Sequence, residues 1–451
     1  MSTDRAPLAE VPEHVLLVGF GVANQAVAKA LLARGHRVSV VDDRPSDGVR
    51  AAAAAAGLSV VEAPDEAALD GLVAGVGLVV AAPGLPDQHP VFRLAERHGV
   101  PTATELDLAG VWDRRPIVAI TGTNGKTTVT TLVTEMLREG GIACVDAGNN
   151  DLPLVAAIDD PEPQWFVVEA SSFRLGRTHG WAPRVATWLN LAPDHLDVHA
   201  THADYEAAKA RIWAAQTGDD VAVGNLDDEV VARHLRAARA RQVAWSTRDE
   251  GADYRLAGDE LVGPGGTLLA VDELPRALGH DVANALAAAA TAEAAGCDRD
   301  ADRRVLRRAA PLPHRVAPVA TVDGVTFYDD SKATVPHATL AAVRGFGSVV
   351  LIAGGRNKGL DLSTLAEGAD HVRAVVAIGE SAGEVAAAFD GIRPVEVAGS
   401  MREAVAAAAR LARPGDAVLL SPACASFDWY PSYAARGDDF AAAVIALQEA
   451  P

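Results

Sequence analysis

The chain has 451 residues, a formal net charge of −20, and 49% hydrophobic but only 5% aromatic residues. At roughly 150 residues per domain this length predicts two to four domains, and we expect three, with aliphatic cores and alanine-rich helices. The negative charge excludes nonspecific binding to nucleic acid or anionic membranes, because the electrostatic contribution to both would be repulsive. Cys144, Cys297 and Cys424 are far apart and lack metal-ligand spacing, which indicates small buried residues in a reducing cytosol.

The sequence contains no pattern typical of a membrane or secretory segment. No apolar run approaches about 18 residues without a charge, glycine or proline, and the N-terminus lacks a basic end followed by an apolar stretch. We therefore expect a soluble, cytoplasmic protein. The alanine runs at 51–56 and 287–290 are interpreted as helix surface.

The first predicted unit, residues 14–43, reads as strand, glycine turn, helix and strand, and a further strand is predicted at 77–84. Its glycine turn, with Gly19 and Gly21, resembles a dinucleotide fingerprint, but Asn24 stands where a third glycine lets the helix pack closely. Asp42 ends the second strand, where a carboxylate can bind a ribose hydroxyl. The pattern predicts nucleotide binding and does not establish nicotinamide chemistry.

The second unit opens with the strongest local signal, TGTNGKTT at 121–128, between an apolar strand and a helix. Backbone N–H groups of such a loop wrap phosphates, Lys126 can contact phosphate oxygens and Thr127 can bind Mg²⁺. Ile120 stands where the general pattern has its first glycine, so the loop is a variant. We interpret it as a nucleotide triphosphate loop.

Further acidic and imidazole groups follow the next strands. Glu169 ends the strand at 165–170, and its carboxylate would reach the edge of a parallel sheet, where it could hold Mg²⁺. The stretch 190–199, NLAPDHLDVH, follows another strand and could hold a second divalent ion. A helix is predicted at 280–296.

Lysine is scarce, with five lysines against 35 arginines, and four of them lie in ligand-type motifs: Lys126, Lys209, Lys332 and Lys358. From spacing alone, Lys209 in the helical pattern YEAAKARIW is best interpreted as a solvated cation. A lysine near two metal ions would be repelled unless it were neutral or had reacted with CO₂ to form an anionic ligand.

The third unit begins near residue 312 and carries strands within 325–330, 348–355, 374–380 and 417–423. Three polar loops follow its strands: DDSKAT at 329–334, GGRNK at 354–358 and SPACASFD at 421–428. Strands alternate with helices throughout, which predicts an α/β fold with parallel sheets in all three domains, so these loops would share one sheet edge.

Taken in order, TGTNGKTT, VVEASSF, LNLAPDHLDVH with AAK, GHDVANALAA, LPHR, DDSKAT, GGRNK and LLSPACASFD resemble the Mur ligases over nearly the whole chain. The resemblance implies three domains: a Rossmann-like domain for a UDP moiety (1–104), a central P-loop ATPase (105–311) and a C-terminal Rossmann-like domain (312–451). It implies ATP-dependent ligation of D-glutamate to UDP-N-acetylmuramoyl-L-alanine, through an acyl phosphate, for peptidoglycan precursors. We expect a cytoplasmic monomer that binds small-molecule substrates, with ATP and two Mg²⁺ ions.

The resemblance also assigns residues. The catalytic and metal set is Lys126, Thr127, Glu169, His195 and Lys209, the last as a carbamylated lysine. The expected ATP contacts are Gly122, Thr123, Asn124, Gly125, Lys126, Thr127, Thr128, His280, Asp281, Asn284, Arg315, Asp330 and Lys332. The expected uridine and muramoyl contacts are Gly21, Val22, Asp42, Asp43, Arg44, Gly84, Asn149 and Ser171. The expected glutamate contacts are Thr334, Lys358, Ser426, Phe427 and Tyr433.

Several positions depart from the family pattern. Asp43 stands where threonine is common, Asp281 where asparagine is usual, and Arg356 with Asn357 where Asp-Gly often precedes the lysine. Asn150-Asp151 and Arg174 replace residues expected near the muramoyl group. None of these changes removes a phosphate or metal group.

Three alternatives remain open. A related ligase could use L-glutamate or another acceptor, since the enantiomer cannot be read from the sequence. A binding or regulatory protein that has lost ligation is disfavoured by Lys126, Glu169, His195 and Lys209. A nicotinamide dehydrogenase is disfavoured by the triphosphate loop.

Overall fold

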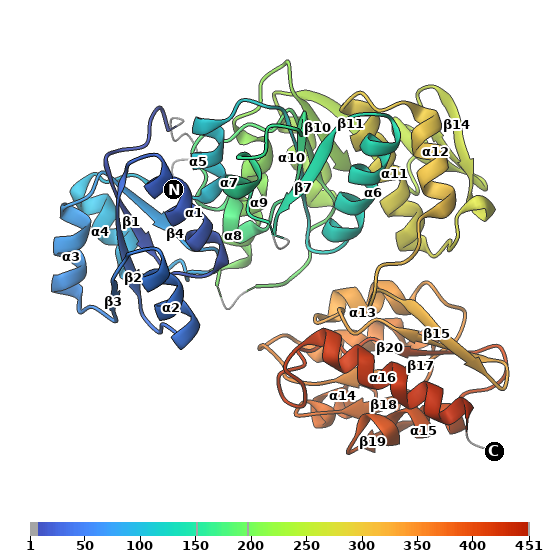
Figure 1. Cartoon of the computed structure of the whole chain (residues 1–451). Helices are drawn as coiled ribbons and strands as arrows, with labels where there is room; N and C mark the ends of the chain where they lie inside the picture. Colours follow the sequence, from blue (N-terminus) through green and yellow to red (C-terminus); the bar gives the residue numbers. More distant parts are fainter. Residues whose placement is uncertain (1–7, 150–151, 196–197, 450–451) are drawn as a thin grey trace. The chain divides into compact units, whose positions relative to one another are not determined.

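Three β-sheets, each flanked by helices, organise the part of the chain that the structure describes (Figure 1). This computed structural model describes residues 8–149, 152–195 and 198–449. The chain divides into two compact units, Met1–Glu273 with Asn284–Arg307, and Leu274–Ala283 with Arg308–Pro451. The first unit holds two of the sheets and the second unit holds the third.

The N-terminal sheet has the strand order β3-β2-β1-β4-β5, and all its pairings are parallel. Its strands are β1 (His14–Val18), β2 (Arg37–Asp42), β3 (Val60–Glu62), β4 (Leu78–Ala81) and β5 (Thr102–Ala103). Its helices are α1 (Val22–Ala33), α2 (Asp47–Ala55), α3 (Glu66–Ala74), α4 (Pro90–His98) and α5 (Glu105–Trp112). The order reverses between β1 and β4, which is where doubly wound sheets bind ligands.

The central sheet has nine strands in the order β14-β13-β12-β11-β10-β9-β6-β8-β7. They are β6 (Ile117–Thr121), β7 (Cys144–Gly148), β8 (Trp165–Glu169), β9 (Val185–Trp188), β10 (Val221–Asn225), β11 (Arg241–Ser246), β12 (Tyr254–Ala257), β13 (Glu260–Gly263) and β14 (Gly266–Ala270). The associated helices are α6 (Lys126–Glu139), α7 (Leu154–Ala157), α8 (Ser172–Leu175), α9 (His202–Ala214), α10 (Glu229–Ala237), η1 (Val271–Glu273), α11 (Gly279–Ala294) and α12 (Arg299–Arg308).

The prediction of a parallel sheet is wrong at one edge of this domain, because β12, β13 and β14 pair antiparallel. Only Gly258 and Asp259 separate β12 from β13, and only Pro264 and Gly265 separate β13 from β14. Two-residue connections can join antiparallel neighbours but are too short for a parallel crossover. The turn residues were visible in the sequence, and the short strands between them were not recognised.

The C-terminal sheet has the order β15-β16-β20-β17-β18-β19 and is parallel except for the β15–β16 pair. Its strands are β15 (Ala317–Val322), β16 (Val325–Asp329), β17 (Val349–Gly354), β18 (Val372–Ile378), β19 (Val395–Ala398) and β20 (Ala417–Leu420). Its helices are α13 (Pro336–Val343), η2 (Leu362–His371), α14 (Ala382–Ala388), α15 (Met401–Leu411) and α16 (Tyr433–Gln448). Two apolar clusters form its core, one shared with α13, η2 and α14 and the other with α15 and α16.

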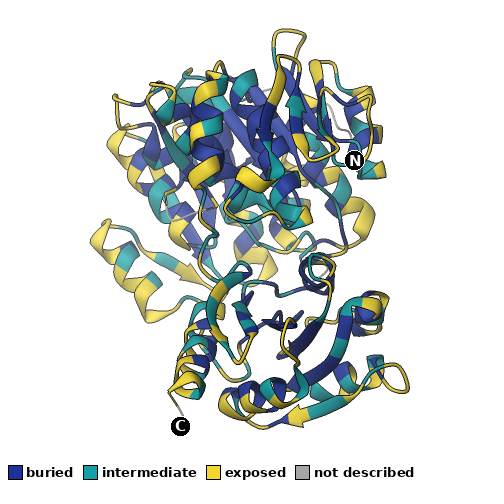
Figure 2. Cartoon of the chain, turned by 90° about the vertical axis from the view of Figure 1, so that its right-hand side faces the viewer, coloured by how far each residue is buried: buried dark blue, intermediate teal, exposed yellow. Residues whose placement is uncertain are grey.

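The strands are largely buried, and many helices carry exposed residues (Figure 2). The two alanine runs differ in burial, and this distinguishes their roles. In the 51–56 run only Ala53 is buried, as expected for helix surface. The interpretation is wrong for 287–290, where all four alanines are 0% exposed. Small side chains let α11 approach the sheet closely, and the hydroxyls of Thr187 on β9 and Thr291 on α11 lie 2.7 Å apart. This run is core.

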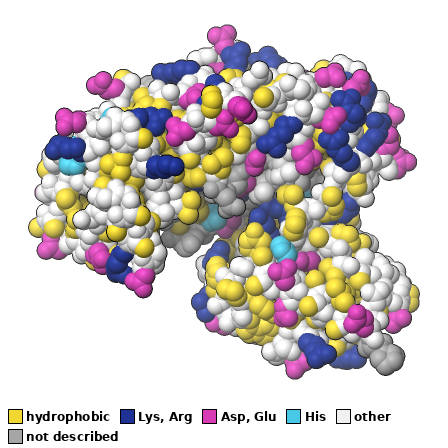
Figure 3. Space-filling view, viewed as in Figure 1, with side chains coloured by type: hydrophobic (Ala, Val, Ile, Leu, Met, Phe, Trp, Pro, Cys, Tyr) yellow, Lys and Arg dark blue, Asp and Glu magenta, His cyan; other side chains and the backbone are white. Residues whose placement is uncertain are grey.

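Charges of both signs are interspersed over the visible surface, with a group of basic side chains over α12 (Figure 3). Four arginines of that helix pair with acids: Arg299 with Glu293, Arg303 with Asp300, Arg304 with Glu139 and Arg307 with Glu273. The basic group is therefore largely neutralised within its own unit. Among the described residues, no helix is long and apolar enough to cross a membrane. All three cysteines are buried and free, as predicted.

Candidate active site

The predicted phosphate loop connects β6 to α6, with Gly125 at the start of the helix in the left-handed region (φ 84°). A Cβ on Gly122 would lie 2.9 Å from Cβ of Leu189, and one on Gly125 would lie 2.7 Å from Oδ1 of Asn284. Both positions therefore require glycine for space, and Gly125 also requires it for backbone conformation. The Lys126 ammonium donates to the carbonyl oxygens of Gly122 (2.8 Å) and Thr123 (2.9 Å), so it folds back over the loop.

Glu169 lies beside this loop, at the carboxyl end of β8. It pairs in register with Ile120 of β6, so the carboxylate and the phosphate loop share one sheet edge. Glu169 is 4% exposed, and its Oε1 accepts a hydrogen bond from Asn149 Nδ2 (3.1 Å). The structure thus brings the predicted metal carboxylate next to a predicted muramoyl contact.

Lys209, on α9, also contacts the phosphate loop. Its side chain is 1% exposed, and Nζ donates to the Gly122 carbonyl oxygen (2.8 Å) and lies 4.6 Å from the centre of the Tyr205 ring. Burial, and next the charge of Lys126, hold the pKa of Lys209 well below its usual range. The interpretation of Lys209 as a solvated cation is wrong, because spacing along a helix does not reveal which face is buried.

His195 follows β9 on the loop that runs along this edge. Its backbone is left-handed (φ 58°), its Nε2 lies 3.2 Å from Oδ2 of Asp194, and its ring packs edge-on against Phe173 at 4.6 Å. Within the described ranges no three His, Cys, Asp or Glu side chains are already gathered as a metal site. Leu196 and Asp197 of the same stretch lie outside the described residues, as do Asn150 and Asp151.

The donor chemistry at this edge suits a hard divalent cation. Glu169 offers a buried carboxylate and Thr127 a hydroxyl at the start of α6, which are oxygen ligands of the kind Mg²⁺ takes. Lys209 is buried within electrostatic reach of Glu169 and Asp194, both of which favour its charged form. The residues present therefore fit Mg²⁺, and a buried amine with a lowered pKa would suit carbamylation.

The predicted uridine residues surround the β1–α1 turn. Asp42 accepts hydrogen bonds from the backbone N–H of Phe20 (2.8 Å) and Arg44 (3.0 Å), so its carboxylate is fixed at the end of β2. Val22 at the start of α1, next to Gly21, is 67% exposed, and Asp43 pairs with His89 (3.0 Å). Gly84 adopts a left-handed conformation (φ 83°) beyond β4.

Asn24 takes a role that the sequence did not predict. It is 1% exposed, and Nδ2 donates to the carbonyl oxygens of Gly19 (2.8 Å) and Val80 (3.3 Å). Where the fingerprint has a glycine that permits close packing, this chain has a side chain that ties the turn to β4. The β1–α1 turn is therefore held by hydrogen bonds.

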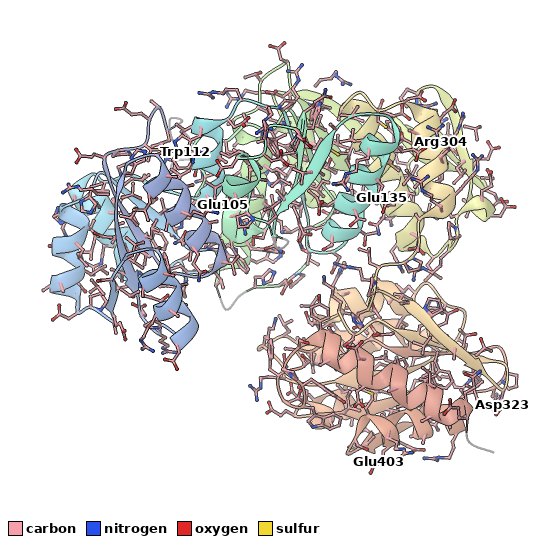
Figure 4. The ribbon with its side chains drawn as sticks, in the orientation of Figure 1. Glu105, Trp112, Glu135, Arg304, Asp323 and Glu403 are labelled. Carbon is pink, nitrogen blue, oxygen red and sulfur yellow. The ribbon has the colours of Figure 1, made fainter. Side chains whose placement is uncertain are left out.

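Two further residues near the muramoyl region are buried. Arg174 on α8 forms an ion pair with Glu105 at the start of α5, and Glu105 also accepts from the Val155 N–H (3.0 Å; Figure 4 labels Glu105). Both side chains are under a tenth exposed. Ser171 is 6% exposed, and its hydroxyl has no hydrogen-bond partner among the described residues. The departure at Arg174 thus serves an internal ion pair.

In the second unit, Asp330 directly follows β16. Its carboxyl accepts from Ser421 Oγ (2.7 Å) and from the Val316 N–H (3.2 Å). Burial raises the pKa of Asp330 to about 7, against the lowering effect of Ser421 and Arg315. Lys332 lies over the Tyr433 ring, with Nζ 5.0 Å from its centre, so predicted ATP and glutamate contacts adjoin each other.

The remaining predicted glutamate contacts differ in exposure. Ser426 is 2% exposed, Phe427 is 60% exposed and Tyr433 is 37% exposed, while Thr334 is half-buried and Lys358 exposed. Arg356, one of the departures, pairs at the surface with Glu380 (2.8 Å). Thr334, Lys358, Ser426 and Phe427 thus lie in the loops that follow β16, β17 and β20, and Tyr433 begins α16.

The predicted adenine residues are divided between the two units. His280 and Asp281 belong to the second unit, where Asp281 pairs with Arg276 (2.7 Å). Asn284 belongs to the first unit, beside Gly125. Helix α11 therefore contributes residues to both compact units.

Comparison with known proteins identifies the family. Residues 120–292 match the Mur ligase middle domain, and residues 314–424 match the Mur ligase, glutamate ligase domain. The chain is 46% identical to the UDP-N-acetylmuramoylalanine--D-glutamate ligase of Frankia casuarinae, over 96% of this chain and 94% of that one. It is 40% identical to the ligase of the same name from Pelotomaculum thermopropionicum, over 97% and 98% of the two chains. The chain belongs to the Mur ligase family.

Solved structures share the fold of this Mur ligase at low sequence identity. A pseudomurein peptide ligase type C from Methanothermus fervidus aligns with a TM-score of 0.61 and 16% identity, covering 96% of this chain and 100% of that one. The UDP-N-acetylmuramate-alanine ligase MurC from Thermotoga maritima aligns with a TM-score of 0.58 and 18% identity, covering 96% and 99%. These likenesses establish the three-sheet α/β architecture.

Two residues of this Mur ligase were missed at the sequence level. Tyr205 is 0% exposed, and its hydroxyl lies 3.1 Å from Thr123 Oγ1 in the phosphate loop. Tyr205 lies four residues before Lys209, so the two side chains share one helix face. This spacing could have identified Tyr205 from the sequence. Arg436 on α16 is 1% exposed and donates to Ser331 O (2.8 Å) and Cys424 O (3.0 Å). No local pattern marks a buried arginine.

Proposed function

We propose that this protein joins D-glutamate to UDP-N-acetylmuramoyl-L-alanine at the expense of ATP, in cytoplasmic peptidoglycan precursor synthesis. The observation that carries the proposal is the meeting of Lys126, Glu169 and Lys209 at the phosphate loop of a chain that is 46% identical to a ligase with this name. The motifs of both matched domains support the same reaction.

The reaction follows from the chemistry of a carboxylate, which does not condense with an amine in water. An oxygen of the alanine carboxylate attacks the γ-phosphorus of ATP, and the bond to the ADP oxygen breaks, which gives an acyl phosphate. The glutamate amine then attacks the acyl carbon, loses a proton, and phosphate leaves as the amide forms. Lys126, next to the loop carbonyls, would exchange those contacts for phosphate oxygens and stabilise the charge that develops there.

Mg²⁺ bound by Thr127 and Glu169, and a second ion bound by His195 and carbamylated Lys209, would neutralise the triphosphate and orient it. Carbamylation needs a neutral amine: the nitrogen attacks CO₂, an N–C bond forms and a proton leaves. The lowered pKa of Lys209, caused mainly by burial, supports this step because it increases the share of the neutral amine. The same burial would protect the carbamate from solvent.

The remaining assigned residues fall into two groups. Gly21, Val22, Asp42, Asp43, Arg44 and Gly84 would bind uridine, with Asn149 and Ser171 at the muramoyl group. Arg315, Asp330 and Lys332 would complete the ATP site, and Thr334, Lys358, Ser426, Phe427 and Tyr433 would bind glutamate. We infer that the enzyme acts as a cytoplasmic monomer, which light scattering would test.

The deciding experiment measures phosphate release from ATP and Mg²⁺ with UDP-N-acetylmuramoyl-L-alanine and either D- or L-glutamate, with the product identified by mass. Release and product with D-glutamate alone are expected. Product with L-glutamate alone would replace the substrate and keep the mechanism, whereas absence of product with both would contradict the proposed ligation.

A further inference from the structure

The side-chain amide of Asn190, just beyond β9, is bonded to the backbone of the phosphate loop. Its Oδ1 accepts from two successive N–H groups, those of Thr123 (3.0 Å) and Asn124 (2.9 Å). Its Nδ2 donates to the Asn124 carbonyl oxygen (3.2 Å). The backbone carbonyl of Asn190 also accepts from the Thr123 N–H (3.1 Å).

The same two segments are joined once more, two residues further along. The Thr123 hydroxyl accepts from the Ala192 N–H (2.9 Å) and lies 3.3 Å from the Ala192 carbonyl oxygen. Residues 190–192 therefore run alongside the first half of the phosphate loop. The chain then continues through Asp194 to His195, so one short segment connects the phosphate loop to the predicted second metal position.

We propose that Asn190 is a positioning residue that fixes the phosphate loop in its ATP-binding conformation and sets its spacing from the 192–195 segment. This proposal rests on the proposed function for the identity of the nucleotide. The loop contains glycines with wide conformational freedom, and without ligand its N–H groups would otherwise face water. An amide suits the position because its oxygen accepts from two N–H groups and its nitrogen donates to the Asn124 carbonyl that follows them.

Asn225 provides a matched control. It ends the neighbouring strand β10, is 8% exposed, and also makes loop contacts: Nδ2 donates to the Leu189 carbonyl oxygen (2.9 Å) and Oδ1 accepts from the Asp227 N–H (2.8 Å). None of these partners belongs to the phosphate loop. Asn225→Ala therefore removes comparable bonds at the same sheet edge, none of which is made to residues 121–128.

The test measures ATP binding by calorimetry in the presence of Mg²⁺, together with KM for each substrate. Asn190→Ala is expected to weaken ATP binding about tenfold or more and to raise KM for ATP equally, with KM for the UDP substrate changed less than about twofold. Asn225→Ala should leave ATP binding within about twofold of wild type. Wild-type ATP affinity in Asn190→Ala, or an equal loss in Asn225→Ala, would overturn the proposal.

Asn190→Asp distinguishes a specific role in positioning the phosphate loop from a general loss of order around Asn190. The carboxylate keeps acceptors for both N–H groups, loses the Nδ2 donation and adds a negative charge close to the phosphates. Its loss of ATP affinity relative to wild type should shrink as salt screens that charge, whereas the loss in Asn190→Ala should not. Equal salt behaviour of the two variants contradicts the assignment.

Failure of the proposed function would be seen separately. A wild-type chain that binds ATP but forms no product with either glutamate would contradict ligation, and the binding comparison would still decide the role of Asn190. A wild-type chain that does not bind ATP would overturn both.

Discussion

Lys126 and Lys209 donate to the same acceptor, the carbonyl oxygen of Gly122, each at 2.8 Å. Two ammonium groups this close repel each other, and only Lys209 is fully buried, so Lys209 is the one whose charge is destabilised. Two lysines of different burial thus contact one carbonyl of the phosphate loop, Lys126 half-buried and Lys209 fully buried. Lysine, unlike arginine, can lose its proton when it is buried, which suits the Lys209 position.

Lys209→Ala is expected to reduce ligation by roughly 10²-fold or more, because the variant would lose the proposed carbamate ligand of the proposed second metal ion. Added bicarbonate or a short carboxylate such as formate should restore part of the activity, measured as phosphate release. Added anion should not restore the activity of Lys209→Arg, since guanidinium does not form a carbamate under these conditions.

Lys29→Ala, at an exposed position on α1, controls for the loss of one lysine. In ¹³CO₂-equilibrated protein the wild type should show a carbamate carbon signal that Lys209→Ala lacks. Full activity of Lys209→Ala without added anion would refute the carbamate.

Arg174→Gln is expected to destabilise the protein by about 3 kcal/mol, because it leaves the Glu105 carboxylate buried without its partner. Glu105→Gln in the same chain should recover more than half of this loss, since the amide oxygen can still accept from the Val155 N–H. Urea unfolding of the two single variants and the double variant measures the coupling. Additive losses would show that the two side chains do not act as a pair.

Arg436→Lys is expected to lower kcat/KM for glutamate about tenfold or more. The guanidinium joins Ser331, next to Lys332, to the Cys424 carbonyl, close to Ser426, and one ammonium cannot reproduce the fork of donors. Steady-state kinetics with glutamate varied would measure this. Arg410→Lys, an exposed arginine paired with Glu396, is the matched control and should stay within about twofold of wild type.

Much of the fold could be predicted from sequence because strand, glycine loop and helix follow each other in fixed order. The segment 117–139 is an example, where apolar strand, glycines and helix were all local signals. The antiparallel edge β12–β14 was missed because its short strands, YRLA, ELVG and GTLLA, contain polar residues or glycine and lack the continuous apolar run that marks β6. Short strands carry too few residues for a reliable period.

The candidate site shows the same division. Glu169 could be placed because it ends an apolar strand, and the sheet confirms that position. The burial of Lys209 and Arg436 and the contacts of Asn190 could not be predicted, since they depend on segments far apart in the sequence. The type and order of residues thus predict which side chains lie at the carboxyl edge of the sheet. Tertiary packing determines which of those side chains are buried away from water.

Asp302 on α12 should make stability depend on pH in an unusual direction. The side chain is 0% exposed, and burial raises the pKa of Asp302 to about 8, with the neighbouring Glu293 charge adding to the rise and the Cys297 thiol opposing it. In the unfolded chain its pKa should be about 3.9. Between these values the folded state holds a proton that the unfolded state has lost, so this residue's contribution to stability falls as pH rises from about 4 to about 8.

Asp302→Asn keeps the shape and removes the titration, so the variant should gain stability relative to wild type as pH rises, by at most about 1.4 kcal/mol per pH unit. The difference in free energy of unfolding, measured with urea between pH 5 and pH 8, should be smallest at pH 5. Asp300→Asn, at an exposed position on the same helix, controls for the loss of a carboxylate from α12. A constant difference across this pH range would mean that Asp302 is already ionised in the folded protein.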